Sequence, residues 1–173
     1  MGGSPCILII IEDVEKLPEM RQKQIECLTQ STLSADDTRE IVKAIKKRYR
    51  GKKVAVSNDI CYATQNRQNA VKALAKKCDA VFILGSSNSS NANRLREVAE
   101  KMGTDAYLVS GLGAVSPKIL NSLERIGISA GASTPEILIS KFIAHLNGKG
   151  WDKVETMGTE EKKIVFKLPD RFV

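Results

Sequence analysis

The sequence predicts an α/β fold in which parallel sheets are flanked by helices. From Cys6 onward, short apolar runs alternate with longer stretches whose apolar residues recur at a period near 3.6. This alternation favours parallel strands, because each parallel pair needs a crossover that is usually a helix. The chain of 173 residues is long enough for one ordinary domain or for two small domains that share a core.

The apolar runs locate the expected strands, and the periodic stretches locate the expected helices. Strands are expected near Cys6–Ile11, Ile25–Leu28, Lys53–Val56, Ala80–Leu84, Ala106–Val109 and Gly127–Ser129. Helices are expected near Asp36–Arg50, Asn66–Lys77, Asn91–Met102, Pro117–Glu124 and Pro135–Asn147. A late strand is expected over Lys163–Leu168, where apolar residues alternate until Pro169.

Local signals mark the starts of three helices. Ser34 and Asp37 form a capping-box pattern, with Asp in the usual place of Glu. Thr134 is the expected N-cap of the last helix, because Pro135 suits the first helical position, where no amide donor is needed. A loop rich in Ser and Asn, GSSNSSN, leads directly into a third helix.

Composition excludes disorder, fibrous repeats and membrane spans. The chain has 42% hydrophobic residues with only 12 Gly and 5 Pro. Its longest apolar run, Cys6–Ile11, is far shorter than the roughly 18–20 residues that cross a bilayer. Four Cys without CxxC spacing favour a reduced, intracellular protein. We expect it in the cytoplasm, or in a plastid or other organelle stroma after removal of any targeting segment. The single His145 lies near a helix end, which leaves no basis for a His-based triad or metal site.

The formal charge is +7, and basic residues gather between Lys46 and Lys53. Binding of nucleic acid is one interpretation, because Lys and Arg attract phosphates. The other interpretation is structural, since cations at the carboxyl end of a helix interact favourably with its dipole. Only Tyr49 interleaves the run, so no platform for stacking bases is evident, and the structural interpretation is favoured.

Polar loops follow the expected strands at Thr29–Ser34, Cys61–Asn66, Gly85–Asn91 and Ala130–Thr134. Ligands of open α/β sheets bind at this carboxyl edge, where free helix amides attract phosphates. Ser, Thr and Asn also cap helices and fill turns without binding a ligand, and this interpretation is favoured for Thr29–Ser34 taken alone. Gly85–Asn91 carries more hydroxyls and amides than one cap needs. It favours an anion site built from hydrogen bonds rather than from Lys or Arg.

Cys61 differs in its position from the other cysteines. It lies in the loop before a helix, whose amides stabilise a thiolate. A nucleophile, a metal ligand and an inert small apolar side chain all remain open for it. Cys6 and Cys27 lie within expected strands, and Cys78 begins one at the opposite edge, so these three are expected to be core or surface residues.

These loops also carry a family resemblance. The segment DICYATQNRQNAVKALAKKCDAVFILGSSNSSNANRLREVAEKMG is preceded by LTQSTLSADDT and followed by ISAGASTPEILI and EEKKIVFKLP. Together, in this order, the motifs closely resemble the LytB-type iron–sulfur enzymes, the 4-hydroxy-3-methylbut-2-enyl diphosphate reductases. The resemblance covers almost the whole chain.

The resemblance implies a diphosphate site and one ligand of a 4Fe–4S cluster. Cys61 matches one of the family's cluster cysteines, and no catalytic residue is implied within this chain. Family hydroxyls and an amide hold or approach the substrate, and one family threonine is replaced by serine here at Ser31. The matching residues are Ser31, Thr32, Ser89, Ser90, Asn91 and Ser133.

The resemblance also implies a reaction, a reductive dehydroxylation that yields isopentenyl and dimethylallyl diphosphate. Electrons would come from a carrier such as ferredoxin or flavodoxin, the cluster would supply the redox chemistry, and the loops would orient the substrate. Two further cluster cysteines belong to a part of the family that precedes this sequence, and one thiolate does not hold such a cluster securely. We therefore expect a separate chain or self-association to supply the rest. The alternatives are a redox-inactive module that binds diphosphate metabolites and, less favoured, a nucleic-acid-binding protein.

The chain resembles the carboxyl-terminal two-thirds of a three-domain family architecture. We expect a partial α/β domain over 1–56, a complete α/β domain over 57–147 and a carboxyl-terminal tail with a late strand over 148–173. The partial domain is expected to expose apolar surface from its strands, including Ile25–Leu28.

Overall fold

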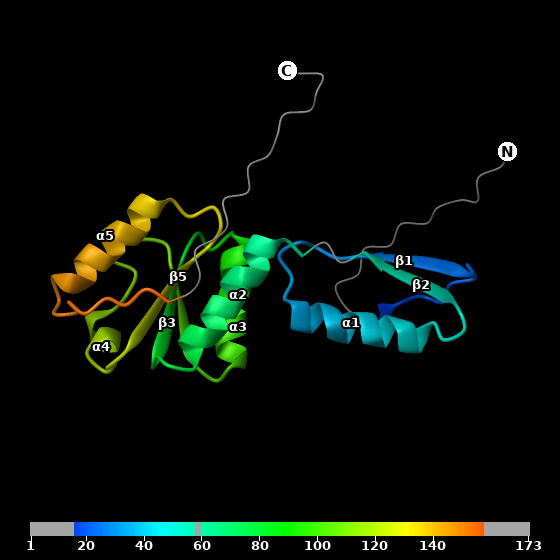
Figure 1. Ribbon diagram of the computed structural model, residues 1–173, viewed down its shortest axis with the longest axis horizontal. Helices are drawn as coiled ribbons and strands as arrows, with labels where there is room; N and C mark the ends of the chain where they lie inside the picture. Colours follow the sequence, from blue (N-terminus) through cyan, green and yellow to red (C-terminus); the bar gives the residue numbers. More distant parts are fainter. Residues whose placement is uncertain (1–15, 58–59, 158–173) are drawn as a thin grey trace, which may run out of the picture. The chain divides into compact units, whose positions relative to one another are not determined.

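The computed structural model of the chain describes residues 16–57 and 60–157 (Figure 1). The chain divides into two compact units, Met1–Cys61 and Tyr62–Val173. All strand pairs in the described ranges are parallel and are accompanied by helices, which confirms the predicted α/β class. The expected strands Cys6–Ile11 and Lys163–Leu168 lie outside the described residues. No helix within the described ranges is long and apolar enough to cross a membrane.

The first unit contains a pair of parallel strands and one helix. Strand β1 (Gln24–Leu28) pairs with β2 (Lys53–Ser57), and Leu28 lies opposite Ser57. Helix α1 (Ala35–Arg48) forms the crossover between them. Because the strands are parallel, β1 and β2 both end at the same edge of this sheet, where the loop after β1 begins.

Helix α1 covers one face of this sheet. Ile25 of β1 packs with Ile45 and Tyr49, and Leu17 completes this small core. The expectation of exposed apolar strand surface is therefore wrong for Ile25, which is only 9% exposed, but it holds for Leu28, which is 66% exposed. Alternate residues of a strand point to opposite faces of the sheet, so a single helix buries only the side chains on the face that it covers.

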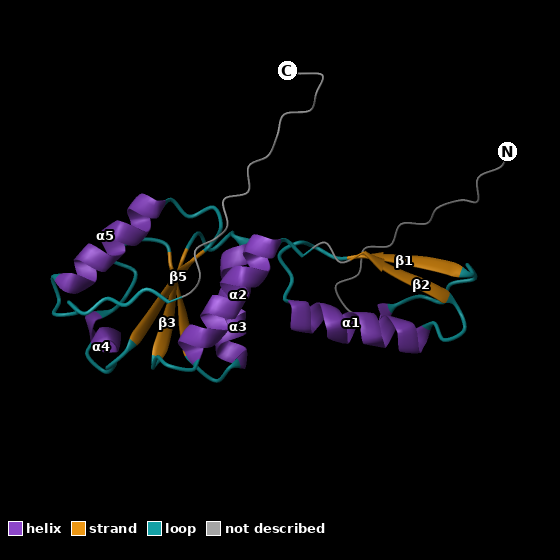
Figure 2. Cartoon of the chain, in the orientation of Figure 1, coloured by secondary structure: helices purple, strands orange, loops and turns teal. Residues whose placement is uncertain are grey.

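The second unit contains a parallel three-stranded sheet in the order β4-β3-β5. Figure 2 shows β3 and β5 of this sheet with the helices around them. Its strands are β3 (Ala80–Leu84), β4 (Asp105–Val109) and β5 (Ile126–Ala130). The central strand β3 is buried at every position, and its bounds agree with the prediction. A continuous apolar run is typical of a parallel strand covered on both faces.

Helices cover both faces of this sheet. Helices α2 (Tyr62–Ala75) and α3 (Ser90–Lys101) lie on one face, and α4 (Pro117–Leu120) and α5 (Glu136–Asn147) lie on the other (Figure 1). The crossover after β3 therefore leaves toward one face, and the crossover after β4 leaves toward the opposite face.

The side chains of β3 divide between the two helical layers. Val81 and Ile83 pack with α2 and α3, whereas Phe82 and Leu84 pack with α4 and α5. Phe82 also contacts Phe142 of α5, with ring centroids 6.1 Å apart. Two apolar layers thus hold β3 rigidly, and its carboxyl end is a fixed point for the loops that surround it.

The capping prediction holds for the first helix and is wrong for the last. The backbone N–H of Asp37 donates to Ser34 Oγ at 3.0 Å, so Ser34 is the N-cap of α1. Pro135 rather than Thr134 occupies the N-cap of α5, where no side chain caps the helix. The Thr134 hydroxyl instead donates to the carbonyl oxygen of Leu84 at 2.9 Å, so this tertiary contact outcompetes the local cap.

Helix α4 ends earlier than predicted, at Leu120 instead of Glu124. The cause is a carboxylate distant in sequence. The backbone N–H groups of Glu124 and Arg125 both donate to Asp79 Oδ2 at 2.8 Å. These two hydrogen bonds hold the pKa of Asp79 below its usual value, and they direct the chain into β5 instead of a longer helix.

Candidate functional site

The strand order of the second unit creates a crevice at the carboxyl edge of its sheet. The loop after β3 leads to α3 on one face, while the loop after β4 leads to α4 on the other. Ligands of open α/β sheets bind where neighbouring connections diverge in this way. The loops at this edge follow Leu84, Val109 and Ala130.

The loop after β3 is folded by its own hydroxyls. The backbone N–H of Asn88 donates to Ser86 Oγ at 3.2 Å. Ser89 is the N-cap of α3 and accepts from the backbone N–H of Ala92 at 3.3 Å. Ser90 is exposed and begins the helix. The predicted anion loop therefore ends at a helix amino terminus, where the first amides lack partners inside the helix.

Asn91 is the most unusual polar residue at this edge. It is only 8% exposed, and neither Nδ2 nor Oδ1 has a hydrogen-bond partner among the described residues. It lies beside the loop after β5, since a Cβ built on Gly131 would be 3.8 Å from Asn91 Nδ2 and 3.4 Å from the Ala92 Cβ. A buried amide without hydrogen-bond partners costs about 1–3 kcal/mol of folding free energy. This cost indicates that the Asn91 amide is available to hydrogen-bond a ligand.

The loop after β5 is fixed to the end of β3. The carbonyl oxygen of Leu84 accepts from the backbone N–H of Gly131 at 2.9 Å and from Thr134 Oγ1 at 2.9 Å. Ser133 lies between these two residues and is exposed. The structure therefore brings Ser133 into the same loop cluster as Ser89, Ser90 and Asn91.

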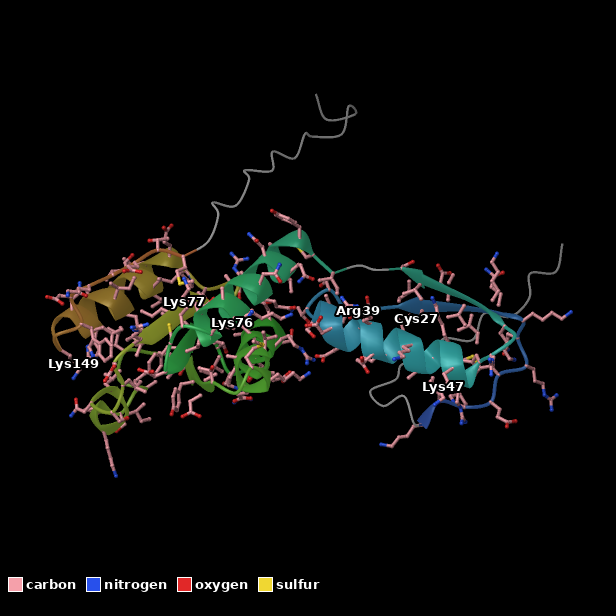
Figure 3. All side chains as sticks on the ribbon, turned by 60° about the horizontal axis from the view of Figure 1, so that its bottom comes forward. Cys27, Arg39, Lys47, Lys76, Lys77 and Lys149 are labelled. Atoms are coloured by element: carbon pink, nitrogen blue, oxygen red, sulfur yellow. The ribbon has the colours of Figure 1, made fainter. Side chains whose placement is uncertain are left out.

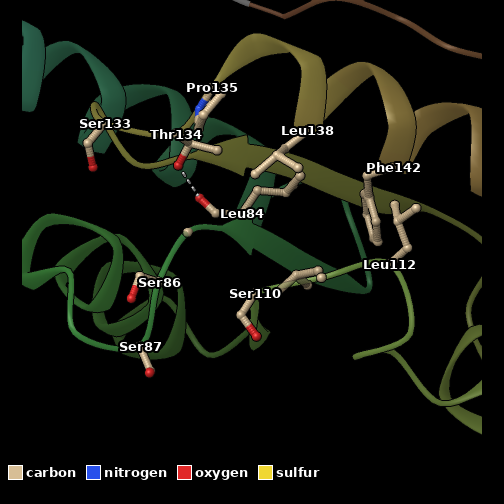
Figure 4. A pocket seen from close by; sticks show the side chains of 13 residues that line it. Leu84, Ser86, Ser87, Ser110, Leu112, Ser133, Thr134, Pro135, Leu138 and Phe142 are labelled. Carbon is tan, nitrogen blue, oxygen red and sulfur yellow. Dashed lines mark hydrogen bonds between the residues drawn. The ribbon is translucent and has the colours of Figure 1, made fainter.

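A pocket of about 360 Å³ opens beside Ser133 at this edge (Figure 4). In the view of Figure 4, its apolar side is formed by Leu112, Leu138 and Phe142, and serine hydroxyls lie around the rest. The lining residues are Leu84, Gly85, Ser86, Ser87, Val109, Ser110, Gly111, Leu112, Ser133, Thr134, Pro135, Leu138 and Phe142. None of these residues carries a charge.

The sequence motifs do not single out Ser110 and Leu112, which the structure places in the pocket lining. They belong to the loop after β4, SGLGAVS. This loop follows the same strand–polar loop–helix pattern as the others, and that pattern could have identified it as part of the candidate site. Thr29 was also missed as an individual residue. Its buried hydroxyl has no partner among the described residues and lies at the start of the loop after β1.

Ser31 and Thr32 lie in the first unit, in that same loop. Ser31 is exposed and Thr32 is half-buried, and the backbone N–H of Leu33 donates to the carbonyl oxygen of Gln30 at 3.1 Å to close a turn around them. They occupy the carboxyl edge of the β1–β2 sheet, where β2 also ends at Ser57.

Cys61 is exposed and immediately precedes α2, which begins at Tyr62 instead of the predicted Asn66. Cys27 and Cys78 are partly buried, and burial raises the pKa of both thiols. The carboxylate of Asp79 raises the pKa of Cys78 further. Within residues 16–57 and 60–157, no three Cys, His, Asp or Glu side chains are grouped to hold a metal ion. The described residues therefore do not by themselves fit a complete iron–sulfur cluster.

The basic run at the end of α1 has a structural use. Arg48 donates through Nη2 to the carbonyl oxygen of Leu17 at 3.0 Å, and Lys52 donates to the carbonyl oxygens of Met20 and Gln22. These contacts tie the segment before β1 to the end of the helix. Lys47, on the last turn of α1, is exposed (Figure 3).

Comparison with known proteins decides the family. The sequence model of the LytB protein family matches residues 1–147. The chain belongs to the LytB family. It is 44% identical to 4-hydroxy-3-methylbut-2-enyl diphosphate reductase of Bordetella pertussis over 96% of this chain, and 44% identical to the reductase of Pseudomonas syringae over 97%. The resemblance identified from the loop motifs is thereby confirmed.

Solved structures of LytB reductases agree with this assignment. The E-1-hydroxy-2-methyl-but-2-enyl-4-diphosphate reductase of Plasmodium falciparum superimposes with a TM-score of 0.83 at 33% identity, over 95% of this chain and 53% of that one. The chain also spans 51% of the Bordetella reductase and 53% of the Pseudomonas reductase. This LytB chain therefore corresponds to about half the length of the relatives it matches.

Proposed function

We propose that this chain forms the diphosphate-binding part of a LytB-type reductase that acts on 4-hydroxy-3-methylbut-2-enyl diphosphate. The names of its relatives support the substrate class, and the hydroxyl-rich carboxyl edge of the second unit supports the mode of binding. In this proposal Ser89, Ser90, Asn91 and Ser133 contact the diphosphate. Ser31 and Thr32 of the first unit are proposed as further substrate residues because they match the family motif.

The buried, unpaired amide of Asn91 is the observation that carries this proposal. A phosphate oxygen can accept from Nδ2, which removes the penalty of leaving that donor unsatisfied. The amino terminus of α3 lies at the same position, and its amides and dipole stabilise negative charge. An anion thus meets several oriented donors at one place.

Neutral donors suit a ligand that must be both held and released. The hydroxyls of Ser89 and Ser133 and the amides of α3 bind charge by hydrogen bonds, without a permanent ion pair. The residues that line the pocket beside Ser133 are uncharged, so they form no ion pair with the ligand. Binding by this chain alone is expected to be weak, because the chain spans about half the length of its relatives and the remaining length would help to enclose the ligand.

We also propose that Cys61 supplies one thiolate to a 4Fe–4S cluster whose other ligands come from a second polypeptide or from the remainder of the family's length. The support is its match to the family motif and its exposed position before α2. When bound, the cluster would supply the redox chemistry, with electrons from a carrier such as ferredoxin or flavodoxin. The residues of this chain would bind and orient the diphosphate.

Calorimetry with isopentenyl diphosphate tests the diphosphate site. Wild type is expected to bind, and Ser133→Ala is expected to bind roughly 10- to 150-fold more weakly, because a hydrogen bond to a charged group contributes about 1.5–3 kcal/mol. Adding Ser89→Ala should weaken binding further. Ser140→Ala is the matched control, since the Ser140 hydroxyl donates only to Glu136 within α5. Absence of wild-type binding, or equal binding by the double variant, contradicts the proposal.

Anaerobic reconstitution tests the role of Cys61. We expect no stable cluster on the chain alone, and cluster absorption together with reductase activity after addition of a polypeptide that carries the amino-terminal half of a LytB reductase. Cys61→Ala should abolish both signals, and Cys78→Ala should keep them, because Cys78 lies at the opposite edge of the sheet. A Cys61→Ala assembly that still turns over would exclude Cys61 as a ligand.

A further inference from the structure

Asn93 lies in the first turn of α3 and binds the serine loop that precedes it. Its Nδ2 donates to the carbonyl oxygen of Ser87 at 2.7 Å and to the carbonyl oxygen of Ser89 at 3.0 Å. A side-chain amide has two hydrogens to donate, so both are used here. The contacts join Asn93 to residues six and four positions earlier in the chain.

These contacts do not serve to cap the helix. Ser89 already caps α3 through its hydroxyl, and the backbone N–H of Asn93 already donates to the Ser89 carbonyl at 3.0 Å. Capping satisfies free N–H groups, whereas the Asn93 side chain binds carbonyl oxygens. The amide therefore has a different effect, which is to fix where the loop carbonyls point.

An anion loop has to keep its carbonyl oxygens away from the ligand, because two sets of lone pairs repel each other. The carbonyl of Ser86 accepts from the backbone N–H of Ser89 at 3.0 Å, so it is occupied within the loop. The carbonyls of Ser87 and Ser89 are occupied by Asn93. These three acceptors are bound internally, so they are held away from an anion at the first amides of α3.

We propose that Asn93 is a positioning residue for anion binding: without touching the ligand, its amide binds the carbonyls of Ser87 and Ser89 and keeps these two oxygens from facing the anion. This inference rests on the proposed diphosphate site, and it adds a residue that acts through Ser89 and the loop backbone. It separates two nearby asparagines by role, since the side chain of Asn91 has no hydrogen-bond partner within the described part of the chain and that of Asn93 has two.

Calorimetry with inorganic diphosphate on the full chain tests this role. Asn93→Ala is expected to weaken binding about tenfold, equivalent to ~1.4 kcal/mol, which is a typical net hydrogen-bond contribution. Asn93→Asp is nearly isosteric but places a carboxylate against two carbonyls and near the anion, so it should weaken binding more than Asn93→Ala does. Asn69→Ala is the matched control, because Asn69 is exposed on α2 and accepts only from Gln65.

Thermal unfolding separates positioning from a purely structural role. A structural role predicts lower melting temperatures for both Asn93 variants with unchanged diphosphate affinity, and this result overturns the proposal. The proposal predicts weaker affinity at temperatures where the variants are fully folded. If wild type binds no diphosphate, the proposed function fails together with this inference, whereas wild-type binding with unaltered Asn93→Ala affinity refutes the inference alone.

A measurement on wild type covers the case in which the variants do not fold. The two side-chain amide protons of Asn93 should exchange with solvent more slowly than those of Asn69 in nuclear magnetic resonance spectra, because both are hydrogen-bonded. Their resonances should shift when inorganic diphosphate is added. Exchange as fast as that of Asn69, with no shift on titration, would overturn the proposal.

Discussion

Substituting Gly85 tests how tightly the end of β3 packs against the first turn of α3. A Cβ built on Gly85 would lie 2.8 Å from the Cβ of Ala92, which is fully buried. Carbon atoms pack best at about 3.5–4.0 Å, so the new methyl group would be about 0.7 Å too close. The Ala92 Cβ is attached directly to the helix backbone and cannot rotate away. In Gly85→Ala, the serine loop or the start of α3 therefore has to move.

The expected cost follows from this overlap. Overpacking of this kind destabilises by about 1–3 kcal/mol, and the reduced freedom of the unfolded chain offsets about 0.4–1 kcal/mol of it. We expect the free energy of unfolding of the second unit to fall by about 1–2 kcal/mol. The single Trp151 packs against the core of this unit, so its fluorescence in a urea titration measures the change. Diphosphate affinity should fall about tenfold, because Ala92 adjoins Asn91.

Two variants control for the effect of adding a methyl group. Gly113, in the loop after β4, does not line the pocket, and a Cβ built on it meets no atom within 4 Å, so the stability and diphosphate affinity of Gly113→Ala should stay close to wild type. Combining Gly85→Ala with Ala92→Gly removes the overlap and should recover part of both losses. If Gly85→Ala unfolds and binds like Gly113→Ala, the packing described here between β3 and α3 is wrong.

Further predictions concern pH, loop geometry and thiol reactivity. The pKa of Asp79 is lower in the folded chain than in the unfolded chain, so the Asp79 carboxylate stabilises the fold above its unfolded pKa. This stabilisation is lost as the pH falls through the folded-state pKa. The melting temperatures of wild type and Asp79→Asn should therefore differ at pH 7 and converge in acid. Thr134→Val removes the hydrogen bond to β3 and should lower stability by about 1 kcal/mol in urea unfolding and weaken diphosphate binding, while Thr134→Ser retains both. Mass spectrometry after brief iodoacetamide treatment should find Cys61 modified before Cys27 and Cys78, because it is exposed and the other two are partly buried; equal rates would contradict this.

The order of the elements followed from the sequence because buried parallel strands appear as continuous apolar runs. Residues Ala80–Leu84 form such a run, and the structure places β3 at these residues. The N-cap at Ser34 was also predictable, because its partner is only three residues away. Patterns among residues close together in sequence thus predict most of the helices and strands.

Features that depend on residues distant in sequence were not predictable. The early end of α4 comes from Asp79, whose carboxylate lies 45 residues before the amide of Glu124. Thr134 binds a carbonyl oxygen 50 residues away instead of capping its own helix. The burial of the Asn91 amide next to Gly131 likewise requires two loops to meet. The motifs predict the polar residues of the proposed site, but only the fold shows which of them have hydrogen-bond partners.

A titration of the isotopically labelled chain with isopentenyl diphosphate, followed by nuclear magnetic resonance, tests the central claim most directly. We predict saturable shifts of the Asn91 side-chain amide and of the backbone amides of Ser89, Ser90 and Ser133. The alternative place for an anion is the basic end of α1, at Lys46 and its neighbours. Shifts confined to that end of α1, or no saturable shift at the Asn91 amide, would contradict the claim that the carboxyl edge of the second sheet binds the diphosphate.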